Sequence, residues 1–392
     1  MDKVAGIVAE FNPLHNGHKY LISSAGKVSD AVVCVMSGSF VQRGEPAILA
    51  KHRRAEAALK SGADLVVELP CPWSLARARD FARGGIFLLK NCLANTIVFG
   101  SESGDIKALK KAASAEQNPL FPELLKNELA GGATYAAART GAMKKIDPKT
   151  AEILRQPNNI LGTEYIIAAE NLNYFPEFIT IKRQGVGHDS DSCSSDIASA
   201  SKIREIFIGD DMDKFVPKQA LEIYKKALLQ GCVLDREKFE TSAGAILRFC
   251  GREVFSNLPD ISEGLDGALY KACRSSATLT DAAFSAKSKR YTLSRIRRLL
   301  CLAALKINAD LCRENPPYIR VLGMTDKGAG LLKKIAKTSE LPIVVRPADA
   351  KKLNPFAAEV FAAEMRASDM QSLCFKNPLP GGAELTESIV KI

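Results

Sequence analysis

Short apolar runs alternate with stretches of helical composition through the first 200 residues. Pro70 ends one apolar run and Gly100 ends another. Continuous apolar strands alternating with helices are typical of a parallel sheet covered on both faces. We therefore predict an α/β fold with a Rossmann-like parallel sheet. Its strands are expected at Val4–Val8, Ala31–Met36, Leu65–Leu69, Thr96–Phe99 and Phe178–Lys182, and its helices from about His18 and over Ala47–Lys60, Ser74–Asn91, 105–142 and 160–173.

After residue 199 the pattern becomes mostly helical, with a short isolated strand expected at 343–345. We expect a sheet domain over residues 1–210 and a mainly helical region over 211–392. In open parallel sheets, ligands bind at the carboxyl ends of the strands. The loops at 9–18, 37–46, 100–105 and 182–189 are therefore the candidate site. The helical patterns of the second region cover 199–208, 217–230, 242–250, 264–275, 292–308 and 357–366.

Composition narrows the class of protein. The chain has 392 residues, 46% of them hydrophobic and 25% charged, which excludes a collagen-like or wholly disordered protein. It contains no apolar run of 18 residues, so we expect no membrane association. The ten cysteines are scattered without a CxxC pair and no signal peptide is visible, so a cytoplasmic location is expected.

Positive charge gathers in the second half of the chain. The formal net charge is +10, of which residues 1–200 carry +2 and the remainder +8. A basic half predicts a polyanionic partner such as a nucleic acid, although a solvated basic surface is the alternative. Tyr291 lies within the densest basic segment and is a candidate for stacking on a base. Candidate contacts to the phosphates of a nucleic acid are Lys287, Lys289, Arg290, Arg295, Arg297 and Arg298.

The strongest chemical signal is AEFNPLHNGH, Ala9–His18, where a strand ends and a helix begins. A helix N-terminus with unused N–H groups suits a phosphate, and Gly17 lets the backbone approach it. His15 and His18, three residues apart, can donate hydrogen bonds to oxygens that gain charge as pyrophosphate leaves. A metal site and a pair of turn histidines are the alternatives, but HxxH without a third ligand is weak for zinc.

A second candidate is the loop after the next strand. Its polar side chains should face the same crevice, where they can orient a small carboxylate. The alternative is a structural loop with a type II turn at Arg43-Gly44. The side chains concerned are Ser37, Ser39, Gln42 and Arg43.

The motif Ala9–His18 resembles the HxGH loop of the nucleotidylyltransferase superfamily, and Ser199–Arg204 is similar to its phosphate-contacting SSxxIR-type loop. In that comparison Ser199, Ser201 and Arg204 are phosphate contacts, although an ordinary capped helix is the alternative. MSGSFVQRGEPA, FGSES, RQPNNILG and IKRQGVGHD stand in the same order as in the bacterial tRNA(Met) cytidine acetate ligases. These motifs begin at Met36, Phe99, Arg155 and Ile181.

The resemblance implies an ATP-dependent ligase with His15 and His18 as catalytic residues. Such enzymes activate acetate as acetyl-adenylate and acetylate the wobble cytidine of elongator tRNA(Met), without acetyl-CoA. Mg²⁺ is expected to screen the phosphates, although no dedicated ligands are visible. A small-molecule adenylyltransferase, of the nicotinamide mononucleotide or phosphopantetheine type, and a non-catalytic RNA-binding protein are the alternatives. It is open whether Asn158 or Asn159 contacts ATP. The implied ATP contacts are Ile7, Val8, Ala9, Glu10, Phe11, Asn12, Pro13, Leu14, His15, Asn16, Gly17, His18, Lys19, Tyr20, Gly100, Asn158 and Arg183.

Overall fold

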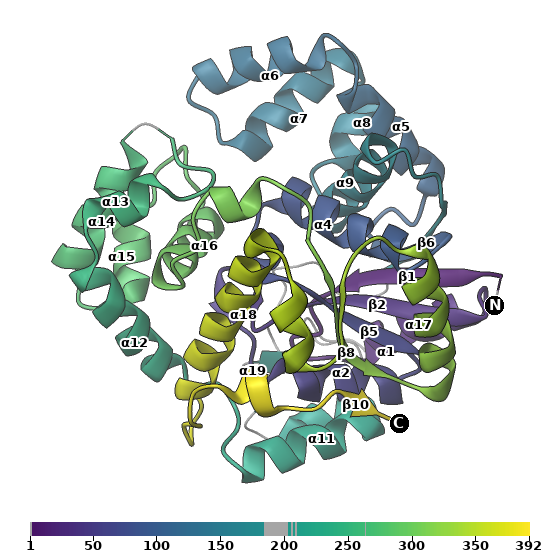
Figure 1. Cartoon of the computed structure of the whole chain (residues 1–392). Coiled ribbons are helices and arrows are strands. Elements are labelled where there is room, and N and C mark those ends of the chain that lie inside the picture. The colour runs from purple at the N-terminus through teal and green to yellow at the C-terminus, as the bar shows by residue number, and fades with distance from the viewer. Residues whose placement is uncertain (1, 184–202, 205–206, 208–209, 263) are drawn as a thin grey trace.

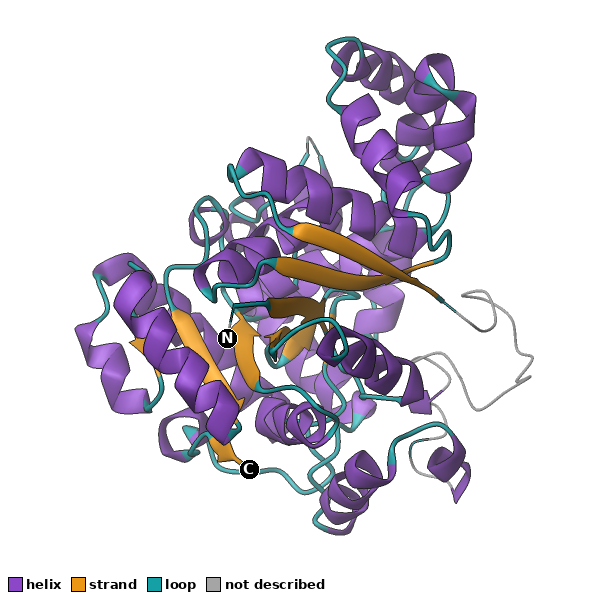
Figure 2. Cartoon of the chain, turned by 90° about the vertical axis from the view of Figure 1, so that its right-hand side faces the viewer, coloured by secondary structure: helices purple, strands orange, loops and turns teal. Residues whose placement is uncertain are grey.

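The computed structural model describes residues 2–183, 203–204, 207, 210–262 and 264–392. Its centre is an eight-stranded sheet with the order β10-β8-β5-β2-β1-β6-β7, in which β9 pairs with β8. Helices cover both faces of the sheet (Figure 1, Figure 2). The five predicted strands are confirmed to within two residues at each end. They are β1 (Val4–Ala9), β2 (Ala31–Ser37), β5 (Leu65–Leu69), β6 (Thr96–Ser101) and β7 (Glu177–Lys182), and they run parallel.

Strand β1 lies at the point where the strand order reverses. From β1 the chain builds the sheet in one direction through β2 and β5, and in the other direction through β6 and β7. A crevice forms outside the carboxyl ends of the strands at such a point. The topology therefore places the loop after β1 at the expected ligand site.

The two faces of the sheet carry different helices. Helices α1 (Asn16–Gly26), α2 (Lys51–Lys60) and α11 (Lys218–Leu229) share one apolar core with strand residues such as Ile7 and Cys34. Helices α4 (Ala78–Asn91), α9 (Pro157–Asn171) and α17 (Asp326–Thr338) share the core on the opposite face. Both side-chain directions of the strands are therefore buried, which explains their continuous apolar runs.

Further helices surround these layers. Helices α5 to α8 form a group with a small core of its own, at the top of Figure 1. Among the described residues, no helix combines the length and apolar character needed to cross a membrane. The remaining helices are α3 (Cys71–Ser74), α5 (Ile106–Glu116), α6 (Phe121–Ala130), α7 (Tyr135–Ile146), α8 (Pro148–Ile153), α12 (Arg236–Phe249), α13 (Arg252–Ser256), α14 (Leu265–Ser275), α15 (Leu279–Ala286), α16 (Leu293–Ala304), α18 (Pro355–Leu373) and α19 (Ala383–Thr386), with short 3-10 helices at Asp210–Lys214, Asp310–Cys312 and Pro347–Lys352.

The second half of the chain is mainly helical, as expected, but it also adds strands to the sheet. Strand β8 (Ile319–Met324) pairs antiparallel with β5, and β10 (Val390–Lys391) pairs with β8. The expectation of an isolated strand at 343–345 is wrong, because β9 (Ile343–Val344) pairs with β8. Arg320 interrupts the apolar run of β8, so the sequence pattern does not indicate that this strand is buried. The division at residue 210 stays a prediction.

Candidate functional site

The two histidines of the loop Ala9–His18, here called the histidine loop, cap the first helix reciprocally. His15 precedes α1, and its Nδ1 accepts the Gly17 N–H at 3.1 Å. The Nδ1 atom of His18 accepts the His15 N–H at 3.4 Å. The two rings stack with their centroids 3.8 Å apart. This is a capping box built from imidazoles, and it fixes both rings relative to the helix.

The capping hydrogen bonds determine the protonation of these rings. Because each Nδ1 accepts a hydrogen bond, the proton of the neutral imidazole sits on Nε2. Burial and the charge of Arg183 lower the pKa of His15 to about 3. Burial, His15 and Arg183 lower the pKa of His18 well below its usual value. Both histidines are therefore neutral near pH 7, and each offers an Nε2–H donor.

The start of α1 is less open than the sequence predicts. The Asn16 N–H donates to the Phe215 carbonyl at 2.8 Å, and the Asn16 side chain donates to the Lys214 carbonyl at 3.0 Å. The Gly17 N–H is bound by His15. The expectation that the first N–H groups of this helix are unused is wrong, because protein acceptors already hold them. Neither imidazole Nε2–H has a partner among the described residues, so these two groups can donate to a ligand at this end of the helix.

A buried arginine joins the histidine loop to the loop after β2 (residues 37–46, here called the β2 loop). The Nη1 atom of Arg54 donates to the Glu10 carbonyl at 2.7 Å and to the Ser37 carbonyl at 3.0 Å. Its Nη2 donates to the Gly38 carbonyl, and its Nε to the Leu49 carbonyl at 3.1 Å. Burial lowers the pKa of Arg54 to about 10, which leaves it charged at pH 7. Sequence reasoning missed Arg54, because an arginine in a helix usually faces solvent.

Arg204 also reaches the histidine loop from far along the chain. Its Nη1 donates to the Asn12 carbonyl at 2.9 Å, and its Nη2 lies 3.2 Å from a Glu45 carboxylate oxygen. Ser199 and Ser201 lie outside the described residues. The role of Arg204 at a phosphate stays a prediction, but the residue is placed beside the predicted ATP segment.

The predicted ATP contacts on β6 and α9 meet at the same end of the sheet. Glu102 accepts the Asn158 N–H at 3.2 Å, the Asn158 side chain at 2.6 Å and the Asn159 N–H at 2.9 Å. Both ends of the Asn159 amide are engaged, because its oxygen accepts from the Ser103 N–H and its nitrogen donates to the Ile153 carbonyl, both at 3.0 Å. The Asn158 Oδ1 has no partner among the described residues. Asn158 is therefore the better placed of the two for a ligand.

Arg183 places a positive charge near the histidines. It follows β7, and a Cβ atom built on Gly100 of β6 would lie 3.4 Å from its Cγ. The side chain is exposed and forms no ion pair within the described part of the chain. The structure thus brings the predicted residues Gly100, Asn158, Arg183, His15 and His18 to one end of the sheet.

Comparisons with known proteins place this site in a family. A model described as HIGH Nucleotidyl Transferase matches residues 2–383. The tRNA(Met) cytidine acetate ligase of Caldanaerobacter subterraneus subsp. tengcongensis is 38% identical, and the alignment covers 99% of both chains. The chain belongs to the tRNA(Met) cytidine acetate ligase family of HIGH nucleotidyl transferases. This membership confirms the resemblance inferred from the motifs and the expectation of an enzyme.

Further members of the family support the assignment. The tRNA(Met) cytidine acetate ligase of Acetivibrio thermocellus is 34% identical over 99% of both chains. Crystal structures of Thermotoga maritima TmcAL match over 100% of this chain, with TM-scores of 0.93 without ligand and 0.90 bound with alpha-thio ATP. Their identities are 31% and 30%, and the match covers 99% and 100% of those chains.

The ligase family motif SGSFVQRGE forms the β2 loop. Some of its predicted acetate-binding side chains are buried and others are exposed. Ser37 and Ser39 are buried, and the Ser39 hydroxyl lies 3.1 Å from the Ser368 hydroxyl of α18 instead of facing the crevice. The Gln42 N–H donates to a Glu10 carboxylate oxygen at 2.7 Å, so this part of the loop touches the histidine loop. Arg43 is exposed. A role for these four residues at acetate stays a prediction.

Two of the six predicted tRNA-binding cations are half-buried and engaged by protein partners. Arg295 pairs with Asp260 at 3.0 Å and covers the ring of Tyr291, whose hydroxyl accepts from Ser262. Arg298 donates to the Gln42 carbonyl at 3.4 Å, and burial lowers its pKa to about 10. Arg295 lies over one face of the half-buried Tyr291 ring, and a role for Tyr291 in base stacking stays a prediction. Arg297 is half-buried, whereas Lys287, Lys289 and Arg290 are exposed.

A cavity of about 310 Å³ lies between α4 and α9 and contains none of the predicted site residues. Its lining mixes Arg79, Arg83 and Arg313 with Asp80, Glu164 and Glu314, so it has no clear charge preference. The site is therefore assigned from the chemistry of the histidine loop and not from this cavity.

Proposed function

We propose that this chain is an ATP-dependent ligase that acetylates the wobble cytidine of elongator tRNA(Met) to 4-acetylcytidine. It first forms acetyl-adenylate from acetate and ATP and releases pyrophosphate. The observation that carries the proposal is the stacked pair His15 and His18 at the reversal point of the sheet. Both rings are neutral, and neither Nε2–H has a partner among the described residues. Full-length relatives named tRNA(Met) cytidine acetate ligase support the substrates.

In the first step an acetate oxygen attacks the α-phosphorus of ATP, and the bond to the pyrophosphate oxygen breaks. Negative charge grows on the leaving pyrophosphate. Nε2–H groups held in place by the capping box stabilise that charge without reorganising. The guanidinium of Arg183 supplies a positive charge and a planar pair of donors for phosphate oxygens. Because the histidines act as neutral donors, this step does not require an imidazolium.

Unused amide donors support a carboxylate subsite next to the histidine loop. The Asn12 Oδ1 accepts the Ile48 N–H at 2.8 Å, which fixes the orientation of the amide. The Asn12 Nδ2 is buried and has no partner among the described residues. The Gln42 Nε2 is likewise buried and unpartnered within the described part of the chain. A carboxylate only accepts hydrogen bonds, so donors of this kind suit acetate. Gln42 and Arg43 are the members of the β2 loop that we propose at this subsite.

In the second step the exocyclic amine of the wobble cytidine attacks the carbonyl carbon of acetyl-adenylate. A carbon–nitrogen bond forms, the bond to the AMP oxygen breaks, and the amine loses a proton. The mixed anhydride is already activated, so the protein mainly positions the two reactants. The exposed Lys287, Lys289 and Arg290 supply phosphate contacts for the tRNA, which makes binding depend on salt.

Mg²⁺ would reach this site together with the ATP phosphates. In the described ranges no group of three or more His, Cys, Asp or Glu side chains could hold a metal ion. Mg²⁺ commonly keeps several waters and binds substrate phosphates, which suits such a site. The ion would screen phosphate charge there. Independence from acetyl-CoA stays a prediction.

Transfer to tRNA tests the whole proposal. Purified protein is incubated with ATP, radiolabelled acetate and a transcript of elongator tRNA(Met), and label in the tRNA is measured. We expect label in this transcript and none in a transcript whose wobble cytidine is replaced by uridine. Label that requires acetyl-CoA, or that is equal in both transcripts, would contradict the proposal.

The two neighbouring asparagines offer a matched test of ATP binding. Asn158→Ala removes the hydrogen bond to Glu102 and an amide oxygen that has no partner among the described residues, so the KM for ATP should rise while stability falls by less than in Asn159→Ala. Asn159→Ala removes two internal hydrogen bonds and should mainly lower stability. The reverse pattern would show that Asn159 is the ATP contact.

A further inference from the structure

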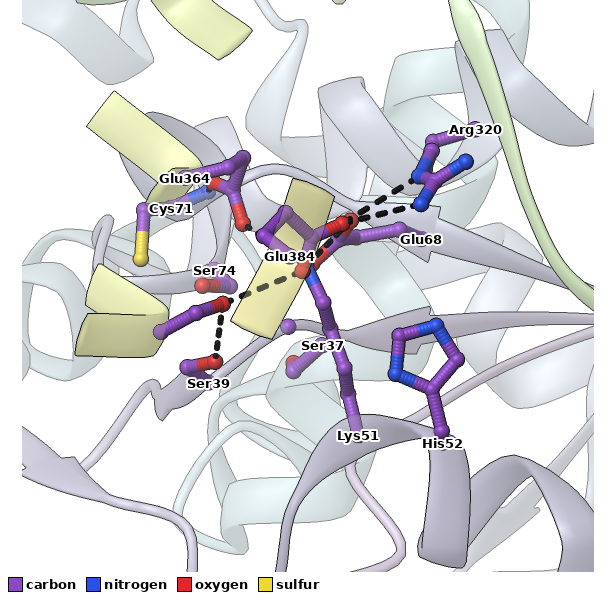
Figure 3. A network of polar contacts seen from close by, with 12 residues as sticks. Ser37, Ser39, Lys51, His52, Glu68, Cys71, Ser74, Arg320, Glu364 and Glu384 are labelled. Carbon is purple, nitrogen blue, oxygen red and sulfur yellow. Dashed lines mark hydrogen bonds and ion pairs between the residues drawn. The ribbon is translucent and has the colours of Figure 1, made fainter. Parts of the chain in front are cut away.

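A group of charged side chains is buried between the sheet and the last helices of the chain. Lys51, Glu68, Arg320, Glu364 and Glu384 are each no more than 2% exposed. We call these five residues the buried charge cluster (Figure 3). They come from α2, β5, β8, α18 and α19, so the cluster joins elements from both halves of the chain.

Lys51 lies at the centre of the buried charge cluster. Its Nζ is 2.7 Å and 2.9 Å from the two Glu68 carboxylate oxygens and 2.8 Å from Glu384 Oε2. On the other side of Glu384, the Arg320 Nη2 lies 3.0 Å from Oε1. Glu364 accepts the Cys71 N–H and lies 3.9 Å from Lys51.

The charges of the cluster balance if Glu364 carries a proton. Burial and the neighbouring Glu68 raise the pKa of Glu364 well above its usual range. If Glu364 is ionised, its Oε2 has no hydrogen-bond partner among the described residues. If Glu364 is protonated, this oxygen can donate a hydrogen bond to Glu68. Burial lowers the pKa of Lys51, but Glu384, Glu68 and Glu364 outweigh burial and raise it. Two carboxylates then face two cations.

The β2 loop rests directly on this cluster. A Cβ atom at Gly38 would lie 2.8 Å from Glu364 Oε2 and still closer to Glu68 Oε1, so the backbone passes against both side chains. The Ser39 hydroxyl contacts the Ser368 hydroxyl at 3.1 Å, and Ser368 donates to Glu384 at 3.2 Å (Figure 3). On its other side the loop is held by Arg54, which binds the carbonyls of residues 37 and 38.

We propose that Lys51 is a positioning residue for acetate, because through Glu68 and Glu384 it fixes Gly38 and Ser39 and so the whole β2 loop. Without the Lys51 ammonium group, the buried carboxylates of Glu68 and Glu384 would share one cation of the cluster, Arg320. The two carboxylates would then repel each other, so their side chains would move apart or admit water. Either change moves the surface on which Gly38 rests. The inference rests on the proposed function, since it takes the β2 loop as the carboxylate subsite.

The test compares three variants by acetate-dependent ATP–pyrophosphate exchange, at a temperature where each is folded. Lys51→Met keeps the length of the side chain and removes the charge, and we expect the KM for acetate to rise at least tenfold while the KM for ATP changes less than threefold. Ser368→Ala leaves all charges in place and removes the link to Ser39, so a rise of about threefold in the acetate KM is expected. Glu364→Gln is the matched control, since an amide reproduces a protonated carboxyl, and it should stay within twofold.

The results separate positioning from simple stabilisation. If Lys51 only stabilised the fold, Lys51→Met would lower the melting temperature and leave both KM values of the folded protein unchanged. That outcome, or an equal rise of the acetate KM in Glu364→Gln, would overturn the inference. If Lys51→Met does not fold, an unchanged acetate KM in Ser368→Ala would overturn it. Failure of the proposed function would differ, because the unsubstituted protein would then show no acetate-dependent exchange.

Discussion

Arg54 offers a sharp test of how the site is built, because it is completely buried and its hydrogen-bond partners within the described residues are all backbone carbonyls. Its guanidinium donates four hydrogen bonds, to the carbonyls of Glu10, Ser37, Gly38 and Leu49. Hydrogen bonds to charged groups contribute about 1.5–3 kcal/mol each. Lysine keeps the charge but not the planar fork, so Arg54→Lys should lose at least two of these bonds. The free energy of unfolding should therefore fall by about 3–6 kcal/mol, a large share of the ~5–15 kcal/mol typical of proteins.

The assay is denaturant unfolding followed by circular dichroism, with Arg53→Lys as the matched control. Arg53 is next in sequence but one-third exposed, and it lies 3.7 Å from Glu56. Its replacement should change the free energy of unfolding by no more than about 0.5 kcal/mol. A loss below about 1 kcal/mol in Arg54→Lys would refute the reasoning, because the carbonyls would then find other partners.

Four further predictions each test a single feature. Gly162→Ala should cost about 1–3 kcal/mol in unfolding experiments, because its Cβ would lie 3.1 Å from the Phe99 Cζ and closer to Cε2. Gly244→Ala, also inside a helix but with open space around it, should instead stabilise by about 0.5–1 kcal/mol. The pKa of His15 is lowered to about 3 in the folded protein, so as the pH falls below 6.5 this histidine is protonated in the unfolded chain but not in the folded one. The free energy of unfolding therefore decreases as the pH falls. Denaturation at pH 6.5 and pH 5 should show a loss of about 2 kcal/mol from this group, which His15→Asn should abolish. Arg183→Gln should raise the KM for ATP about tenfold in the exchange assay, because one charge-assisted contact to phosphate is lost. An unchanged KM would show that Arg183 does not contact ATP.

The sheet and the histidine loop could be predicted because their signals are local. Continuous apolar runs identify strands buried on both faces, and a motif such as Ala9–His18 needs only the neighbouring residues to be interpreted. Strand β8 could not be predicted in this way, since Arg320 is neutralised by Glu384, which lies 64 residues further along the chain. A charge whose partner is distant in sequence looks the same as an exposed one.

The same limit applies to the site. Nothing in the sequence indicates that Arg54 would be buried under carbonyls, or that Lys51 would meet three glutamates. For a related reason, the sequence overstates how many cations of the basic segment 287–298 are available to a nucleic acid. Arg295 pairs with Asp260, and Arg298 donates to the Gln42 carbonyl. Tertiary contacts decide whether a charged side chain faces a ligand or the protein.

The most direct test of the central claim is ATP–pyrophosphate exchange by the purified protein. Exchange is measured with acetate, with nicotinamide mononucleotide and with phosphopantetheine, in the unsubstituted protein and in His18→Ala. The account predicts exchange that depends on acetate and is lost in His18→Ala, while binding of elongator tRNA(Met) is retained. Exchange that depends on one of the other two acceptors, or acetate-dependent exchange that survives in His18→Ala, would contradict it.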